Sequence, residues 1–199
     1  MTISLTYFDF EGSRGLECRL ALTMAGLAYE DVRLSRDQWT ALKPSVPFGA
    51  LPVLAEGNRR IAQSNAILGY IGRGHGLHPV DSWQAAEHEA LMQSVEDLRA
   101  KIPDGKGQTP EEKKTAREAF AAGWLHQWAA TVSDRITGPF LDGKALNVAD
   151  IKLFVILRSL LSGTFDHIGP SCFEAFPKLV ALHAAVDAHP AIHGYFHKS

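Results

Sequence analysis

Cysteine is scarce in this sequence, since its 199 residues include only Cys18 and Cys172. The two lie far apart and form neither a CxxC pair nor a zinc-finger spacing, so a disulfide-stapled or zinc-organised domain is excluded. The chain is long enough to bury a stable core without such a staple. We expect both cysteines to be small hydrophobic residues rather than nucleophiles, in a reducing compartment.

An excess of charge of one sign is also lacking. The sequence has 20 lysine and arginine residues against 22 aspartate and glutamate residues, for a net charge of −2. The most apolar later stretch, LFVIL, is bounded by Lys152 and Arg158, and the N-terminus lacks the pattern of a signal peptide. We therefore expect a cytoplasmic protein that binds small molecules or another protein, with no nucleic acid and no membrane as partner.

Several common catalytic motifs are missing as well. The sequence contains no glycine-rich phosphate loop, HExxH, GxSxG or Ser/His/Asp ordering. His189, His193 and His197 recur every four residues, which is compatible with metal ligands on one helix face. Pro190 and the nearby chain end favour a short helix, and no carboxylate neighbours the set, so we expect no metal.

The hydrophobic periodicity divides the chain into two parts. Residues 1–77 alternate between strand-like and helix-like patterns in the order β-α-β, then β-β-α. From Trp83 the pattern is helical to the end. We therefore expect an α/β domain at 1–77 and an all-α domain at 83–199, the latter with helices at 83–102, 110–136, 148–163, 176–188 and 190–198.

Three local features of the first part have both a structural and a functional interpretation. Tyr7 ends the first strand, where a tyrosine is usually a rim residue. Leu51-Pro52 stands where a loop becomes a strand, so its bond is either an ordinary trans bond or the rarer cis form. Ser64 occupies an expected N-cap position, where it either caps its own helix or joins a helix start that binds a carboxylate.

One helix start in the second part is legible as a folding signal. In LNVADIK, the Asn147 side chain is placed to accept from the backbone N–H of Asp150, and the Asp150 carboxylate to reach back to the helix start. Leu146 can pack on Ile151 as a hydrophobic staple. This pattern predicts a capping box rather than a catalytic pair.

Taken together and in order, these segments resemble the cytosolic glutathione transferases, most closely the sigma class, which includes prostaglandin D synthases and S-crystallins. The resemblance runs nearly end to end. It is carried by LTYFDFEGSRG, AGLAYEDVRL, WTALKPSVPFGALPVL, IAQSNAILGYI, LNVADI and PKLVALHAAVDAHPAI. It implies a thioredoxin-like βαβ-ββα domain followed by an all-helical domain, usually in a homodimer.

The resemblance also implies a site for glutathione as co-substrate, with a hydrophobic pocket for an electrophile beside it. Tyr7 matches the catalytic tyrosine and Arg14 the arginine after the first loop. The other implied glutathione contacts are Trp39 and Lys43 at the glycyl end, Leu51 and Pro52 at the cysteinyl part, Gln63 and Ser64 at the γ-glutamyl carboxylate, and Asp97 reaching the neighbouring subunit. The implied pocket residues are Phe8, Phe10, Arg99, Lys152 and Ile156.

The chemistry that the resemblance implies is activation of a thiol. A free thiol titrates near 8.5, so little thiolate exists at neutral pH. Lowering that pKa by about two units requires roughly 2.7 kcal/mol, which is within the ~1.5–3 kcal/mol of a hydrogen bond to a charged group. The Tyr7 hydroxyl could supply most of it, with Arg14 adding positive potential.

Departures from the sigma-class pattern limit this assignment. The EGSRG loop is one residue longer, which affects the direction of Arg14, and Ala50 stands where relatives often carry Gln or Lys. Asp104 and Lys152 replace aromatic residues expected in a prostaglandin isomerase. These two replacements argue against the isomerase assignment. The alternatives to conjugation are a glutathione-dependent peroxidase or isomerase and, in another class, a non-catalytic glutathione-binding or structural crystallin-like protein.

Overall fold

The computed structural model describes residues 2–197 and divides the chain into two compact units. The first comprises Met1–Glu89 and His189–Ser199, and the second comprises Ala90–Ala188. Helix α4 (Ser82–Lys101) begins in the first unit and ends in the second. The domain limits of 1–77 and 83–199 that we expect from the sequence stay a prediction.

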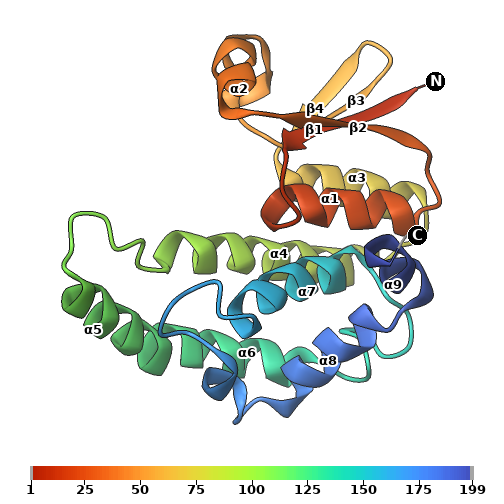
Figure 1. Cartoon of the computed structure of the whole chain (residues 1–199). Helices are drawn as coiled ribbons and strands as arrows, with labels where there is room; N and C mark the ends of the chain where they lie inside the picture. The colour runs from red at the N-terminus through yellow and green to blue at the C-terminus, as the bar shows by residue number, and fades with distance from the viewer. Residues whose placement is uncertain (1, 198–199) are drawn as a thin grey trace. The chain divides into compact units, whose positions relative to one another are not determined.

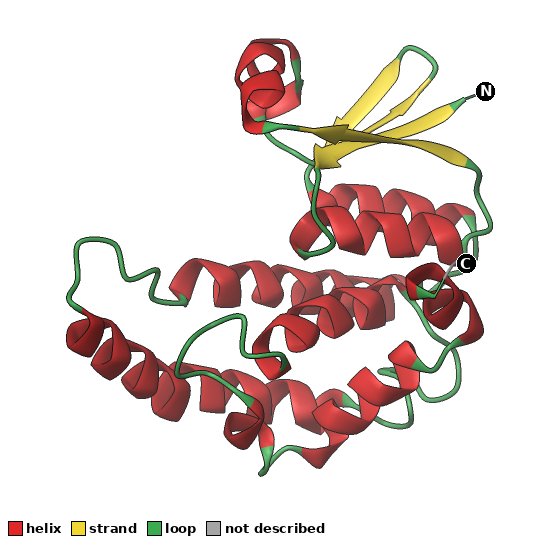
Figure 2. Ribbon diagram, in the orientation of Figure 1, coloured by secondary structure: helices red, strands yellow, loops and turns green. Residues whose placement is uncertain are grey.

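The first unit is built on a four-stranded mixed sheet in the order β2-β1-β3-β4 (Figures 1 and 2). Strand β1 pairs in parallel with β2 and antiparallel with β3, and β3 pairs antiparallel with β4. The parallel pair requires a crossover connection, which contains α1 (Ser13–Met24). The strands are β1 (Ile3–Phe8), β2 (Tyr29–Leu34), β3 (Val53–Glu56) and β4 (Arg59–Ala62).

Helices α1 (Ser13–Met24) and α3 (Ser64–Gly74) pack side by side on one face of this sheet (Figure 1). Their apolar residues form the core with the inward residues of β1 and β3, including Leu5, Leu16, Leu20, Leu54, Ile67 and Leu68. Helix α9 (Pro190–Phe196) contacts α1 within the same unit. Lys198, the last residue of the helix predicted there, lies outside the described residues.

Helix α2 (Arg36–Leu42) follows β2 and is an element that the periodicity does not predict. It is short and has no buried residue, so it leaves no apolar stripe in the sequence. A capping box starts it: the Ser35 hydroxyl accepts from Gln38 N–H, and the Gln38 side chain accepts from Ser35 N–H at 2.8 Å. Two 3₁₀ turns, η1 (Lys43–Ser45) and η2 (Pro47–Gly49), lead on to β3.

The second unit is helical, as the sequence predicts. Helix α7 is buried along almost its whole length and packs against α8. The segment predicted as one helix at 110–136 is helical throughout, but a π-helical turn interrupts it. Besides the end of α4, its elements are α5 (Pro110–Phe120), η3 (Ala121–Leu125), α6 (His126–Arg135), α7 (Val148–Leu161), η4 (Pro170–Phe173) and α8 (Pro177–Asp187).

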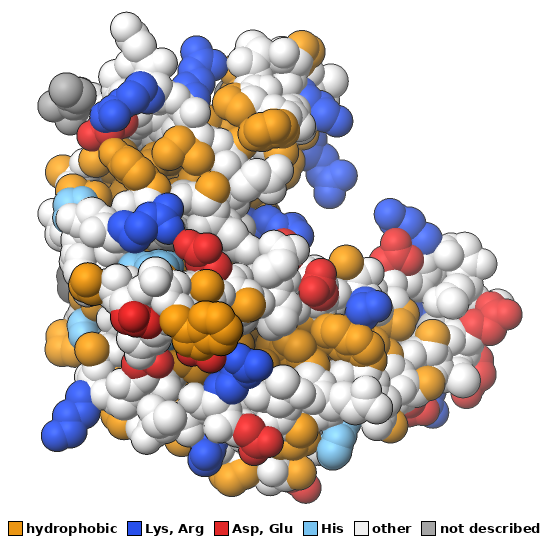
Figure 3. Space-filling model, turned by 180° about the vertical axis from the view of Figure 1, so that it is seen from behind, with side chains coloured by type: hydrophobic (Ala, Val, Ile, Leu, Met, Phe, Trp, Pro, Cys, Tyr) orange, Lys and Arg blue, Asp and Glu red, His pale blue; other side chains and the backbone are white. Residues whose placement is uncertain are grey.

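The surface agrees with the balanced composition. On the face drawn in Figure 3, acidic and basic side chains are interspersed rather than gathered by sign. Of the helices between residues 2 and 197, none is both long and apolar enough to cross a bilayer.

Candidate functional site

The strand register places three of the predicted site residues at one end of the sheet. Thr6 lies opposite Val53, and Val53 lies opposite Ala62. Tyr7 follows Thr6 in β1, Pro52 directly precedes β3 and Gln63 directly follows β4, so all three lie one residue beyond this last set of paired residues, at the same end of the sheet. The Leu51-Pro52 bond just before β3 is cis, so the rarer of the two expected forms is the one present.

The Tyr7 side chain is packed among aromatic rings and is only 5% exposed. Its ring centroid lies 5.6 Å from that of Phe8 and 5.6 Å from that of Phe10. The guanidinium carbon of Arg19 lies 6.0 Å from the same centroid. Tyr7 is therefore held in a low-dielectric environment rather than lying flat on the rim of the sheet.

Arg19 is a buried residue of α1 that the sequence analysis did not single out. Its Nη1 donates to the carbonyl of Phe10 at 2.9 Å and its Nη2 to that of Phe8 at 3.3 Å, while Nε donates to Asp31 at 3.0 Å. It thereby fixes the backbone directly after Tyr7. The only signal in the sequence is an arginine amid the apolar residues of a helix.

The start of α3 differs by one residue from the prediction. Gln63 is the N-cap and Ser64 the first helical residue, so the expectation that Ser64 is the N-cap is wrong. Gln63 has φ 75° and ψ 114°, a conformation that costs a residue with a β-carbon roughly 1–3 kcal/mol and clusters at functional sites. The prediction placed the cap at the residue with the better capping side chain. The first N–H groups of α3 and its positive dipole end lie beside Ser64, which is 4% exposed.

Trp39 and Lys43 come from the segment that the periodicity left without structure. The Trp39 ring in α2 lies 6.1 Å from the Phe8 ring, at an interplanar angle of 81°. Lys43 opens η1 with an exposed side chain that runs alongside Gly49. Trp39 and Phe8 thus link α2 to the end of β1.

The remaining predicted residues of the first unit differ in their exposure. Arg14 is the second residue of α1 and is half-buried, whereas Phe10 is 46% exposed. Leu51 is half-buried just before the cis bond.

Four predicted site residues belong to the second unit. Asp97 is exposed on α4. Arg99 Nη1 lies 2.8 Å from Glu96 Oε1, and Lys152 Nζ lies 2.6 Å from the same oxygen. Lys152 and Ile156, one turn apart on α7, are buried. The predicted pocket residues are thus divided between the two units.

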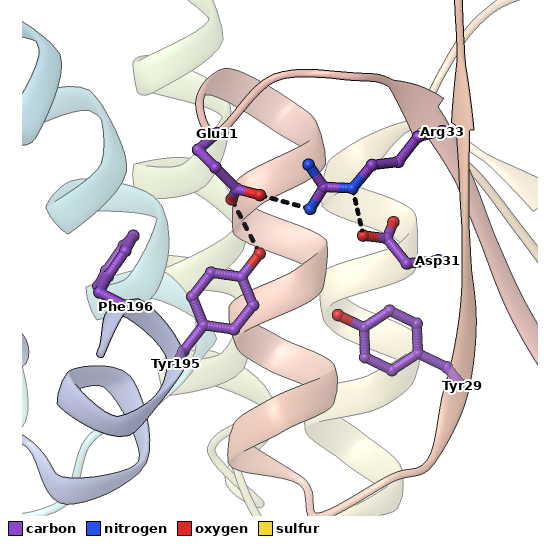
Figure 4. A pocket seen from close by; sticks show the side chains of 6 residues that line it. All are labelled: Glu11, Tyr29, Asp31, Arg33, Tyr195 and Phe196. Atoms are coloured by element: carbon purple, nitrogen blue, oxygen red, sulfur yellow. Dashed lines mark hydrogen bonds and ion pairs between the residues drawn. The ribbon is translucent and has the colours of Figure 1, made fainter. Parts of the chain in front are cut away.

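A separate cavity of about 520 Å³ lies in the first unit, between β2 and α9 (Figure 4). Glu11 joins its walls, because one oxygen pairs with Arg33 and the other accepts from the Tyr195 hydroxyl at 2.9 Å. Burial raises the pKa of Tyr29 to about 12, and burial with the Glu11 hydrogen bond raises that of Tyr195. The lining residues are Glu11, Tyr29, Asp31, Arg33, Tyr195 and Phe196.

The histidines of the C-terminal segment do not assemble into a metal site. The His193 and His197 rings lie 4.2 Å apart, which is a ring contact. Within residues 2–197, no group of three or more His, Cys, Asp or Glu side chains is arranged to hold a metal ion.

Comparison with known proteins places the chain in one family. The profile of the glutathione S-transferase N-terminal domain matches residues 3–73, and that of the C-terminal domain matches residues 96–199. The hematopoietic prostaglandin D synthase of Gallus gallus is 30% identical over 98% of this chain and 94% of its own length. Glutathione S-transferase 2 of Onchocerca volvulus is 28% identical over 100% and 93%.

Solved structures agree in fold. The prostaglandin synthase D of Nilaparvata lugens superposes with a TM-score of 0.84 at 27% identity, covering 100% of this chain and 98% of that one. A glutathione S-transferase of Necator americanus described as monomeric, Na-GST-3, superposes at 0.85 with 24% identity over 98% and 96%. A thioredoxin-like first domain and a helical second domain are therefore confirmed, and the chain belongs to the glutathione S-transferase family.

Proposed function

We propose that the protein is a glutathione transferase that binds glutathione at the end of the sheet where Tyr7, Pro52 and Gln63 lie. The observation that carries the proposal is that these three residues lie at one end of the sheet, with the start of α3 directly after Gln63. This end of the sheet combines a tyrosine, the backbone that leads into β3 and a helix N-terminus. Glutathione requires a thiol activator, a partner for its peptide backbone and a carboxylate site.

In this proposal Tyr7 donates a hydrogen bond to the sulfur of glutathione. The environment of the ring supports this role, since a buried hydrogen bond to an anion is stronger than an exposed one. Stabilising the thiolate by about 2.7 kcal/mol would lower the thiol pKa by about two units. Arg14, in the first turn of α1, contributes positive potential.

The remaining contacts bind and orient the tripeptide. Leu51 pairs its backbone with the cysteinyl residue, and Gln63 with Ser64 holds the γ-glutamyl carboxylate at the helix start. Trp39 and Lys43 bind the glycyl end. Fixing the sulfur in this way allows it to attack an electrophilic carbon in a neighbouring apolar pocket beside Phe8 and Phe10. The pocket roles of Arg99, Lys152 and Ile156, which belong to the second unit, stay predictions.

We also propose a homodimer in which Asp97 reaches the γ-glutamyl amine bound by the partner subunit. The exposed position of Asp97 on α4 supports this contact. Sedimentation would show a dimer, and Asp97→Asn would raise the KM for glutathione without changing the dimer mass. A monomer at micromolar concentration would contradict the proposal. The cytoplasmic location stays a prediction.

The test of the function is a steady-state assay with glutathione and an aryl halide, run beside one with cumene hydroperoxide. We expect conjugation by the wild type, with kcat/KM reduced at least tenfold in Tyr7→Phe. Turnover of the hydroperoxide alone would favour a peroxidase. Failure to bind immobilised glutathione would instead favour the non-catalytic, crystallin-like alternative.

A further inference from the structure

Gly15 lies directly against the Tyr7 ring. A β-carbon built on Gly15 would lie 2.0 Å from Cδ1, 2.5 Å from Cγ and 2.7 Å from Cε1 of Tyr7. Carbon atoms in contact normally lie about 3.5–4.0 Å apart. Gly15, the third residue of α1, therefore packs directly against the Tyr7 ring and leaves no room for a side chain of its own.

The backbone of Gly15 gives no other reason for a glycine. Gly26 and Gly57 have positive φ values of 66° and 60° and open space around them, so their conformation accounts for them. Gly15 differs from these two in both respects, because it is buried in helix α1 and is not among the glycines with positive φ. Glycine within a helix is unfavourable relative to alanine. The reason that remains for a glycine at position 15 is the space that its missing side chain leaves for the Tyr7 ring.

The Tyr7 ring has little freedom to move away from a side chain at position 15. It is 5% exposed, and the rings of Phe8 and Phe10 contact it. Arg19 holds the carbonyls of both phenylalanines, so this surround is itself anchored. Relieving a contact of 2.0 Å requires a shift of about 1.5 Å if atoms are to reach ordinary separation.

We propose that Gly15 is a positioning residue for thiol activation: its missing side chain sets the place of the Tyr7 ring and thereby of the hydroxyl that meets the sulfur. This inference rests on the proposed function of Tyr7. A misplacement of about 1 Å can cost on the order of 100-fold in rate. Gly15→Ala should therefore raise the pKa of bound glutathione toward the free value of about 8.5.

The experiment is a pH titration of thiolate absorbance in the glutathione complex of the full chain. It compares the wild type, Gly15→Ala and a matched control, Gly74→Ala, whose added carbon meets nothing within 4 Å at the end of α3. We expect Gly15→Ala to raise the thiol pKa by one unit or more and to lower kcat/KM at least tenfold. Gly74→Ala should leave both unchanged. An unchanged thiol pKa and rate in Gly15→Ala would overturn the proposal.

A double-mutant cycle tests the contact itself, even if Gly15→Ala folds poorly. In a Tyr7→Ala background the added carbon has room, so Gly15→Ala should shift the urea midpoint far less than in the wild type. An equal shift in both backgrounds would refute the contact. This cycle does not depend on catalysis: if Tyr7→Phe kept its thiolate, the proposed function would fail while the cycle still reported on the packing.

Discussion

Replacing Asp150 by alanine should lower the free energy of unfolding at pH 5 by about 2–6 kcal/mol. Its carboxylate accepts from Leu141 N–H at 2.7 Å and from Asn147 N–H at 3.0 Å, and the residue has no exposed surface. Alanine leaves both donors without these acceptors, and each such buried group costs about 1–3 kcal/mol. The Asp150 bond to Asn147 confirms the capping box predicted from LNVADIK. The bond to Leu141 adds a tie to the preceding loop, so the loss exceeds the ~1–2 kcal/mol expected for Asn147→Ala.

The same residue predicts a pH dependence. Burial raises the pKa of Asp150 to about 7, against the opposing effect of its two N–H donors. Because the pKa in the folded state lies above the unfolded value of about 3.9, the contribution is complete below about pH 4 and is lost as the pH rises through about 7. The wild type should therefore lose stability between pH 5 and 8 by an amount that Asp150→Ala does not show.

The assay for both effects is urea unfolding followed by tryptophan fluorescence and circular dichroism at pH 5 and pH 8. Glu112→Ala is the control, since Glu112 completes a solvent-exposed capping box with Thr109, where water can replace the lost acceptor. The reasoning from burial would be wrong if Asp150→Ala lowered the free energy of unfolding at pH 5 no more than Glu112→Ala does. It would also be wrong if Asp150→Ala lost as much stability between pH 5 and pH 8 as the wild type.

Three further predictions concern the first unit. Gln63→Gly should raise the free energy of unfolding by about 1 kcal/mol, because glycine tolerates φ 75°. The same variant should raise the KM for glutathione. Urea unfolding measures the first effect and steady-state kinetics the second, and a destabilised variant would contradict strain at Gln63. Arg19→Lys should lower the free energy of unfolding by about 1–3 kcal/mol. The guanidinium group of Arg19 donates to the carbonyls of Phe8 and Phe10 and to the Asp31 carboxylate, and a lysine ammonium cannot reach all three. A urea midpoint of Arg19→Lys equal to that of the wild type would contradict this. Tyr29→Phe should reduce the loss of thermal stability above pH 10. Because the pKa of Tyr29 is raised in the folded protein, the stability contributed by the neutral hydroxyl is lost as the pH rises from about 10 toward about 12. Melting temperatures at pH 9 and pH 11 measure the effect, and an equal loss in the wild type and Tyr29→Phe would contradict it.

The sequence predicts much of the fold because its signals are local. The strands and helices that the sequence predicts for the first part, β-α-β and then β-β-α, occur in that order, since alternation and β-branched or aromatic residues act over a few positions. The capping box of Asn147 and Asp150 likewise depends on only four consecutive residues. Helix α2 went unpredicted because it buries nothing, although Ser35 and Gln38 carried a capping signature.

The site is less accessible to sequence reasoning, because its members meet through pairing of distant strands. Taken alone, Tyr7 is indistinguishable from a rim residue, and only the strand pairing puts it at the same end of the sheet as Pro52 and Gln63. Gly15 could not be singled out either, because its importance lies in a contact with a ring eight residues earlier. The resemblance to a family implies the residue roles, whereas the strand pairing shows which of these residues share one end of the sheet.

The central claim is that Tyr7 stabilises the thiolate of bound glutathione. The direct measurement is a titration of thiolate absorbance against pH, with wild type and Tyr7→Phe side by side and glutathione saturating. We expect a thiol pKa about two units below the free value of about 8.5 in the wild type and a return most of the way toward it in Tyr7→Phe. An equal thiolate fraction in the two proteins across the titration would contradict it.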